Sequence, residues 1–487
     1  MSFLSEEQVI FEGGKNKEMN SEGIFGYRIP ALLKTQEGTL IAGADERHLH
    51  NMDWGNIDMV VRRSEDNGET WGEKIVVADL QTNPDAEDKE SDSALLIDMA
   101  LLQDPKTGRV FSVYDMYPEQ RGLFGMMKEN RDRVENGEEP VDEEQYTELD
   151  GKHYLNLYHE DGGDVYTVRE KGIVHDPAGK PTEYRVVLTS ETAPYNDLGD
   201  LYKGDELVDN VYFTTNKKGP FRIAKESYMW VSHSDDDGKT WSCPRDITPQ
   251  VKLPWMKFYG VGPGVGIVLE HGDHKGRLVF ATYATNHSYE LDYSQSARVI
   301  YSDDHGETWV TGAAVNDDRP LENGEVIHSS TMHNREEQNT EAVPVELNNG
   351  LIKLFMRNRK GMLAAATSRD GGETWDETID YYEDVPEVYV QMSAVQTVQD
   401  GQEYIVLTNA NGPDRNNGYA RVAKVEEDGS LTWLHHKLIQ EGEFAYNALQ
   451  QIGPDTFACL YEHTRDGGNY FTFYFRTFDW AFLTSED

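Results

Sequence analysis

The sequence has little cysteine. Its 487 residues include only Cys243 and Cys459, which allow one bridge at most and exclude a disulfide framework or a cysteine-rich metal site. It also lacks any apolar run long enough to cross a membrane, so we expect no membrane insertion. The first residues have neither a basic region nor an apolar region after it, and we therefore expect no signal peptide in this chain.

Basic residues are scarce as well. The chain has 45 Lys and Arg against 88 Asp and Glu, a formal net charge of −43. Such a charge repels nucleic acids and anionic lipid headgroups, which excludes both as partners, and its simplest interpretation is solubility. A group of arginines that converge on one site would therefore indicate an anionic ligand. Such a ligand needs these arginines to bind to a protein with so large a negative charge.

No common metal or phosphate motif is present. The chain contains neither H-E-x-x-H nor a P-loop. When its repeated glycines are aligned with the sixth position of a calcium loop, Arg63, His233 and Tyr301 occupy the first position, where Asp is required. We expect no metal and no cofactor.

What the chain does contain is a repeated octet, Ser-x-Asp-x-Gly-x-Thr-Trp. It occurs at residues 64–71, 234–241, 302–309 and 368–375, with a degenerate copy at 428–433. In such a sequence Ser and Asp cap backbone amides, Gly takes positive φ, and Thr-Trp opens a strand. We expect each octet to form a tight turn with the Trp ring packed beneath it.

The spacing of the octets predicts the architecture. The second to third and third to fourth copies begin 68 and 66 residues apart, which is typical of blades in an all-β propeller. The first and second begin 170 residues apart, so the chain has an insertion there. We predict a propeller formed by residues 1–117 and 223–487 and a small β-rich inserted domain at 118–222.

Several chemically distinctive residues lie outside the octets, at strand ends or in polar loops. These are Arg28, Arg47, Asp53, Asp98, Glu341, Arg357, Arg415 and Tyr446. Arg28 could be an edge residue that reaches solvent, and Asp98 could be a structural partner of Arg47. A carboxylate inside an apolar run such as that of Asp98 is otherwise paired or catalytic, since its burial alone is costly.

The pattern resembles the bacterial sialidases, which are six-bladed β-propellers with Asp-box repeats. The resemblance covers nearly the whole chain except the insertion, and the octets correspond to the Asp boxes. Its other motifs are Tyr27-Arg28-Ile29-Pro30, Asn339-Thr340-Glu341, Arg357, Gly412-Pro413-Asp414-Arg415 and Phe444-Ala445-Tyr446-Asn447.

The resemblance implies that Arg28, Arg357 and Arg415 grip the carboxylate of sialic acid, which planar guanidinium groups bind well. It implies that Tyr446 is the nucleophile and Glu341 its base, since a carboxylate nucleophile would be repelled by the substrate's own carboxylate.

Further roles follow from the same resemblance. Asp53 would be the general acid/base, with a pKa raised toward neutrality by its neighbour Trp54. Arg47 and Asp98 would lie near the sugar's 4-hydroxyl, and Ile29 would also contact substrate.

Residues 44–55 and the insertion look most similar to the intramolecular trans-sialidases. That resemblance implies release of 2,7-anhydro-N-acetylneuraminic acid from α2,3-linked glycoproteins, mucins and glycolipids, by a monomeric bacterial protein that is secreted or at the cell surface. A hydrolytic sialidase, another Asp-box glycosidase and a sialic-acid-binding lectin are the alternatives. A lectin would have no reason to keep Asp53, Glu341 and Tyr446 together.

Overall fold

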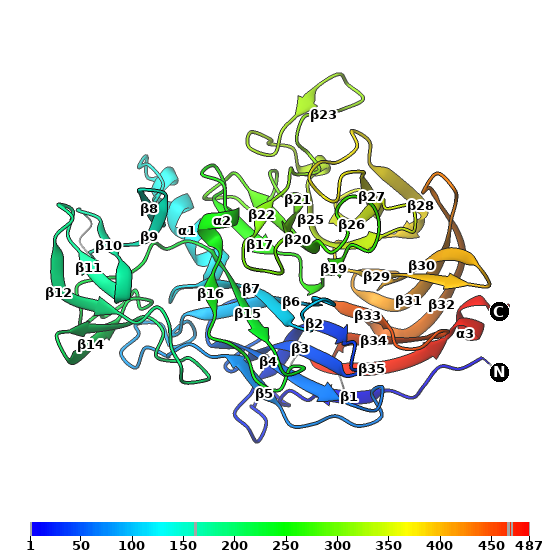
Figure 1. Ribbon diagram of the computed structural model, residues 1–487, viewed down its shortest axis with the longest axis horizontal. Helices are drawn as coiled ribbons and strands as arrows, with labels where there is room; N and C mark the ends of the chain where they lie inside the picture. Colours follow the sequence, from blue (N-terminus) through cyan, green and yellow to red (C-terminus); the bar gives the residue numbers. More distant parts are fainter. Residues whose placement is uncertain (1, 160–162, 465–467, 469–470, 487) are drawn as a thin grey trace.

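The computed structural model describes residues 2–159, 163–464, 468 and 471–486. It is a six-bladed β-propeller with a β-rich extension on one side (Figure 1). This confirms the predicted fold class. No helix in the described ranges is both long and apolar enough to cross a membrane.

Each blade has four antiparallel strands, to which the second and third blades add one short strand each, and neighbouring blades contact one another around the axis. The first blade has β2 (Gly26–Lys34), β3 (Leu40–Arg47), β4 (Ile57–Ser64) and β5 (Ile75–Ala78). The second has β6 (Leu95–Gln103), β7 (Val110–Tyr117), β15 (Tyr228–Ser234) and β16 (Arg245–Asp246), with β18 (Gly264–Val265) parallel to β6. The third has β17 (Phe258–Val261), β20 (Leu278–Thr285), β21 (Ser296–Ser302) and β22 (Val310–Thr311), with β19 (Ile267–Val268) beside β20.

The remaining blades follow in chain order. The fourth has β25 (Asn339–Glu346), β26 (Ile352–Asn358), β27 (Met362–Ser368) and β28 (Asp380–Pro386). The fifth has β29 (Ser393–Gln399), β30 (Gln402–Ala410), β31 (Asn416–Val425) and β32 (Leu431–Glu443). The sixth has β33 (Asn447–Gln451), β34 (Thr456–His463), β35 (Thr472–Asp479) and β1 (Gln8–Phe11). Short elements between them are α2 (Thr248–Val251), β23 (Arg319–Pro320), β24 (Val326–Ile327), the 3-10 helix Arg335–Glu337 and α3 (Trp480–Thr484).

The two ends of the chain close the ring. Strand β1 pairs with β35, with Gln8 opposite Phe475, so the sixth blade contains both the first and the last strand. The termini accordingly lie close together (Figure 1). The propeller has no open seam between its first and last blades.

The octets form the turns between the third and fourth strands of four blades. In the first, Ser64 Oγ accepts from Gly68 N at 2.8 Å, and Asp66 accepts from the backbone and hydroxyl of Thr70 at 2.9 and 2.5 Å. The other three octets repeat these bonds. The expected turn chemistry is therefore present.

Each octet also contacts the preceding blade. A Cβ added at Gly68, where φ is +92°, would lie 2.4 Å from the Phe475 ring on β35. The Trp71 ring packs edge-on against the same Phe475, with centroids 5.4 Å apart. The Trp71 ring, which we expected to pack beneath its own turn, thus contacts the neighbouring blade.

The chain between β7 and β15 forms the side extension at the left of Figure 1. It comprises α1 (Gly122–Glu135) and a seven-stranded sheet: β8 (Tyr146–Leu149), β9 (Lys152–Leu157), β10 (Tyr166–Val168), β11 (Ile173–His175), β12 (Pro181–Val186), β13 (Asp200–Lys203) and β14 (Glu206–Asn210), with the 3-10 helix Glu170–Gly172. Its Leu157 and Leu201 share one apolar cluster with Tyr114 and Trp230 of the second blade. The insertion is therefore packed onto the propeller through a common core.

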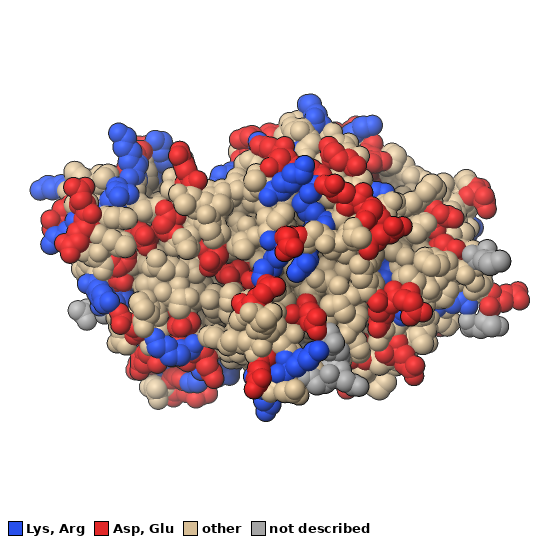
Figure 2. Space-filling model, turned by 90° about the horizontal axis from the view of Figure 1, so that it is seen from below, with Lys and Arg blue, Asp and Glu red and all other residues tan. Residues whose placement is uncertain are grey.

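Acidic side chains are spread over the face shown in Figure 2, with Lys and Arg interspersed among them. This face has no continuous basic stripe of the kind that binds a phosphate backbone. The distribution agrees with the net charge of −43.

Candidate active site

An open cleft of about 1060 Å³ gathers the chemically distinctive residues. Its lining includes Arg28, Ile29, Asp53, Asp98, Glu341, Arg357, Arg415 and Tyr446. Arg47, the ninth predicted site residue, is fully buried and donates to Asp53 at 2.8 Å. The structure thus brings all nine predicted residues together from five blades.

Three of these residues lie where the first strand of a blade is bulged. The pairing register shifts between Arg28 and Ala31 in β2, between Ile97 and Ala100 in β6, and between Asn339 and Ala342 in β25. Such bulges re-aim side chains and are common beside active sites. The bulge in β2 also accommodates Pro30, which has no N–H for the ladder.

Backbone strain accompanies two of the bulges. Ile29 has φ of +59° and Asp98 has φ of +67°, values that non-glycine residues seldom adopt. Strain of this kind is typical of functional sites. Here it turns the Arg28 and Asp98 regions toward the cleft.

Tyr446 and Glu341 form the central pair. The Tyr446 hydroxyl donates to Glu341 Oε1 at 2.5 Å, while Arg357 Nη1 donates to Glu341 Oε2 at 2.6 Å and to the Tyr446 oxygen at 2.9 Å. Burial and the Glu341 charge raise the pKa of Tyr446 well above its ordinary value, although Arg357, Arg415 and Arg28 oppose them. The phenol is therefore neutral, with a base in contact.

Three guanidinium groups surround the Tyr446 ring or its oxygen. Those of Arg28 and Arg415 lie 5.1 and 5.5 Å from the ring centroid, and Arg357 contacts the hydroxyl. Within the described ranges Arg415 forms no ion pair with a carboxylate, in contrast to Arg28 and Arg357. Its charge is available to an anionic ligand in the cleft.

Glu462, on β34, was missed by the sequence analysis. Its buried carboxylate accepts from Arg28 Nε and Nη2 at 3.1 and 3.2 Å, and from the backbone N–H groups of Ile29 and Tyr446 at 2.7 and 3.2 Å. It therefore fixes an arginine and two backbone segments of the site at once. The only sequence signal was an acid within the apolar strand Cys459-Leu-Tyr-Glu462.

Asp53 lies on the loop after β3, with its side chain 41% exposed. It accepts from Arg47 at 2.8 Å and lies 3.5 Å from Arg28. Loss of water around the carboxyl acts to raise its pKa, but the charges of Arg47 and Arg28 outweigh this and lower the pKa below its ordinary value. The prediction of a raised pKa caused by Trp54 was thus wrong for the unliganded protein, because two arginines hold the carboxylate.

Asp98 and Asp45 lie next to this group. Asp45 accepts from Arg47 Nη2 at 3.1 Å and from the Asp98 backbone N–H at 3.2 Å. Burial, with the charges of Asp45 and Asp115, raises the pKa of Asp98 well above its ordinary value. Arg47 pairs with Asp45 and Asp53. The alternative interpretation, in which Asp98 is the structural partner of Arg47, is therefore wrong.

Tyr389 is a second residue that the sequence analysis missed. Its ring lies between two guanidinium groups, 4.0 Å from that of Arg357 and 3.4 Å from that of Arg359. Arg359 in turn pairs with Asp292 at 2.9 Å. The Arg357 guanidinium is thus held by the Tyr389 ring as well as by Glu341.

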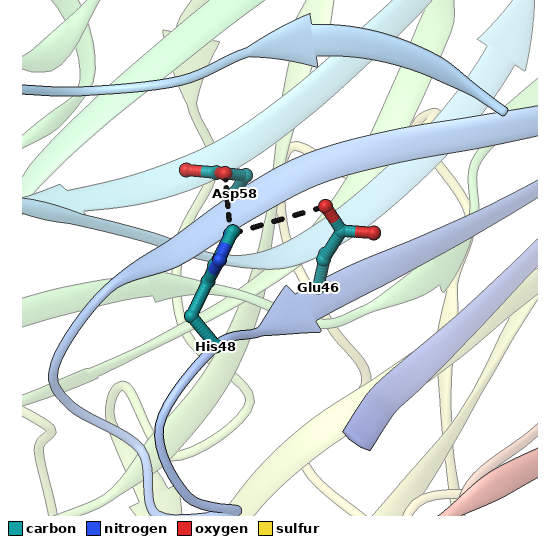
Figure 3. A group of neighbouring side chains, drawn as sticks. All are labelled: Glu46, His48 and Asp58. Carbon is teal, nitrogen blue, oxygen red and sulfur yellow. Dashed lines mark hydrogen bonds and ion pairs between the residues drawn. The ribbon is translucent and has the colours of Figure 1, made fainter. Parts of the chain in front are cut away.

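One group of side chains in the described part of the chain has metal-ligand character: Glu46, His48 and Asp58 (Figure 3). His48 Nε2 lies 2.8 Å from Asp58 and 3.8 Å from Glu46. Lys74 already pairs with Glu46 at 2.5 Å, and the Tyr27 hydroxyl donates to the same carboxylate. Oε2 of Glu46 is thus already occupied by two side chains of the protein.

The chain was compared with known proteins. Residues 209–457 match the family model described as a BNR repeat-like domain. The chain is 30% identical to the anhydrosialidase of Macrobdella decora and 28% identical to Sialidase B of Streptococcus pneumoniae, in each case over 93% of its length. It spans 59% and 63%, respectively, of the length of these relatives.

Solved structures share the fold. The intramolecular trans-sialidase of Ruminococcus gnavus, in complex with oseltamivir carboxylate, superimposes with a TM-score of 0.77 over 99% of both chains at 24% identity. The leech intramolecular trans-sialidase, complexed with 2,7-anhydro-Neu5Ac, gives a TM-score of 0.76 over 99% of this chain and 71% of that one, also at 24% identity.

Proposed function

This chain belongs to the BNR repeat-like family and to the sialidases within it, and from that premise we propose that it is a retaining exo-α-sialidase. The observation that carries the proposal is the contact between the Tyr446 hydroxyl and Glu341, at 2.5 Å, inside a ring of three arginines. A nucleophile, a base and a carboxylate-binding site are thereby combined in one cleft.

Binding begins with the sugar carboxylate. Arg415 has an open charge, and Arg28 and Arg357 are held in place by Glu462 and Glu341. Guanidinium groups that are already oriented lose little freedom when they bind a planar anion, which favours tight and directed binding. The anomeric carbon, which bears this carboxylate, then lies over Tyr446.

Bond cleavage uses the Tyr446–Glu341 pair and Asp53. The Tyr446 oxygen attacks the anomeric carbon while Glu341 accepts the phenol proton. The bond from that carbon to the glycosidic oxygen breaks, and Asp53 donates its proton to this oxygen. A neutral phenol is a better nucleophile here than a carboxylate, because the substrate's own carboxylate would repel a second negative charge.

Asp53 must be protonated for this step, although the free protein lowers its pKa. The incoming sugar carboxylate neutralises part of the positive charge of Arg28 and Arg415, two of the groups responsible. We expect the pKa of Asp53 to rise when substrate binds. Asp53 would thus be a carboxylate in the free protein and hold its proton in the complex that uses it as a donor.

For the second half of the reaction we propose attack by the sugar's own 7-hydroxyl. Asp53 accepts the proton of this hydroxyl, the new oxygen–carbon bond forms, and Tyr446 leaves and recovers its proton from Glu341. The product is 2,7-anhydro-Neu5Ac. Similarity to an anhydrosialidase and to two intramolecular trans-sialidases favours this outcome over attack by water.

The proposed substrates are terminal α2,3-linked sialic acids of glycoproteins, mucins and glycolipids, and the proposed place of action is outside a bacterial cell. The test is incubation with α2,3-sialyllactose, followed by mass spectrometry and NMR of the released sugar. A product one water lighter than sialic acid supports the intramolecular reaction. Free sialic acid indicates a hydrolase, and binding without release indicates a lectin.

A further inference from the structure

Helix α1 of the insertion begins directly beside Asp53. A Cβ added at Gly122, the first residue of the helix, would lie 2.7 Å from the Asp53 backbone oxygen, and Gly122 has φ of +54°. Such proximity is possible only for glycine. The first turn of α1 is therefore fixed next to the backbone of the residue that serves as the acid in the proposed function.

Phe124 follows in the same turn and lines the cleft. It is 47% exposed, so part of the ring is free of contacts with the rest of the protein. One edge of the ring packs against Trp54, with centroids 6.3 Å apart and planes at 71°. The rest of the ring is open toward the cleft.

The rest of α1 is held in place from the propeller side. Asn130 Nδ2 donates to the Ser288 backbone oxygen at 2.9 Å, and Arg131 Nη2 donates to that of Tyr289 at 3.2 Å. Both acceptors lie on the loop that follows β20. The helix is thus anchored at both ends, and Phe124 occupies a defined position on the cleft wall.

The charges along the helix near Phe124 are mostly compensated. Lys128, one turn further on, pairs with Asp132 at 2.5 Å. An exposed aromatic side chain whose neighbouring charges are paired is suited to stack on a neutral ligand ring that offers an apolar face, rather than to bind a second anion.

Resting on the proposed function, the geometry points to a subsite for the leaving group. Asp53 protonates the glycosidic oxygen, so the sugar attached to that oxygen must lie beside Asp53, where α1 begins. We propose that Phe124 stacks on this neutral hexose and makes the insertion a determinant of specificity for the sugar next to sialic acid.

The test compares two substrates that differ only in the leaving group: α2,3-sialyllactose and methyl α-sialoside. Both release an alcohol after protonation by Asp53, so a change in their ratio of kcat/KM in a variant reports contacts with the leaving sugar. We expect Phe124→Ala to lower the ratio by about threefold to tenfold, the range typical of a lost ring contact. Phe124→Tyr, which keeps the ring, should retain the wild-type ratio.

Leu207→Ala is the matched control, because Leu207 lies on β14 of the same insertion, is 51% exposed and does not line the cleft. Its ratio should equal that of the wild type. An active wild type whose ratio is unaffected by Phe124→Ala overturns this inference alone. A wild type that cleaves neither substrate overturns the proposed function and the inference with it.

Discussion

The carboxylate of Glu462 accepts two hydrogen bonds from the Arg28 guanidinium, at 3.1 and 3.2 Å, although 434 residues separate them. The same carboxylate binds the backbone N–H groups of Ile29 and Tyr446. One acid from the last blade therefore sets the position of an anion-binding arginine from the first blade and of the proposed nucleophile.

Replacing this acid should affect both stability and catalysis. In Glu462→Gln the buried Arg28 loses its counter-charge, which we expect to cost about 3 kcal/mol of unfolding free energy and at least about tenfold in kcat/KM. Denaturant unfolding and steady-state kinetics on α2,3-sialyllactose measure the two. Glu65→Gln, which removes an exposed partner of Arg63 and leaves its pair with Asp237, is the control and should change neither. Wild-type kinetics in Glu462→Gln would contradict the positioning role.

Removing the Tyr446 hydroxyl should separate binding from turnover. Tyr446→Phe keeps the ring beneath Arg28 and Arg415 but has no nucleophile, so kcat should fall by at least about a thousandfold. Calorimetric binding of sialic acid should change by less than about tenfold. Tyr381→Phe, at a partly exposed tyrosine outside the cleft, should leave both values unchanged. Residual turnover close to that of the wild type would mean that another group attacks the anomeric carbon.

The pH profile should report the change in the Asp53 pKa. In the free protein the partial loss of water acts to raise this pKa, but Arg47 and Arg28 lower it below its ordinary value. Asp53 therefore loses its proton at a lower pH than an ordinary Asp. In the complex the sugar carboxylate offsets the arginines. We therefore expect the fall attributable to Asp53 on the alkaline side to occur at higher pH in kcat than in kcat/KM. The profiles of Asp53→Asn identify the part of each wild-type profile that is due to Asp53. Identical pH profiles of kcat and kcat/KM in the wild type would contradict a ligand-induced rise of the Asp53 pKa.

A second pH effect concerns stability. Burial raises the pKa of Glu387 to about 7, while backbone N–H groups of Asn358 and Val390 act against burial. A carboxyl whose pKa is raised by folding stabilises the protein fully below its unfolded-state value and loses this contribution as pH rises through the folded value. Between about pH 4.5 and about pH 7 the wild type should therefore lose about 3 kcal/mol relative to Glu387→Gln. Parallel stability curves from urea unfolding of the two proteins would disprove this.

Gly68 in the first octet and Gly38 in the turn between β2 and β3 offer a matched pair of glycine substitutions. Gly68→Ala combines positive φ with a Cβ only 2.4 Å from the Phe475 ring, whereas Gly38→Ala has positive φ and open space around it. We expect Gly38→Ala to cost about 1 kcal/mol and Gly68→Ala about 1–3 kcal/mol more, since only the second must also move the neighbouring blade. Equal shifts in thermal unfolding would mean that the octet does not join the blades.

The octets made the blades predictable because they are local: four bonds within eight residues recur wherever the sequence does. Arg28, Glu341 and Tyr446 could likewise be predicted, since each lies in a short motif. The sixth blade could not be derived from repeats, because its β1 and β35 pair across almost the whole chain.

Glu462 was missed for the same reason, as its partners are distant in sequence and one acid in an apolar strand carries no local signal. The Asp53 pKa was predicted with the wrong sign, since Trp54 is next to it in the sequence, whereas its contacts with Arg47 and Arg28 depend on the loop after β3 and on the bulge in β2. Features that depend on neighbouring residues in the sequence could thus be predicted, whereas the effects of charged groups that folding brings together could not.

The closure of the ring by β1 and β35 has a consequence for biosynthesis. A ribosome makes β1 long before β35, so the pairing that closes the ring cannot form until β35 has been made. Arg415, Tyr446 and Glu462 are likewise made long after Arg28. We therefore expect nascent chains to stay without activity until the sixth blade has been made, and a premature stop before β33 to leave an open ring with an unpaired edge that is prone to aggregation and degradation.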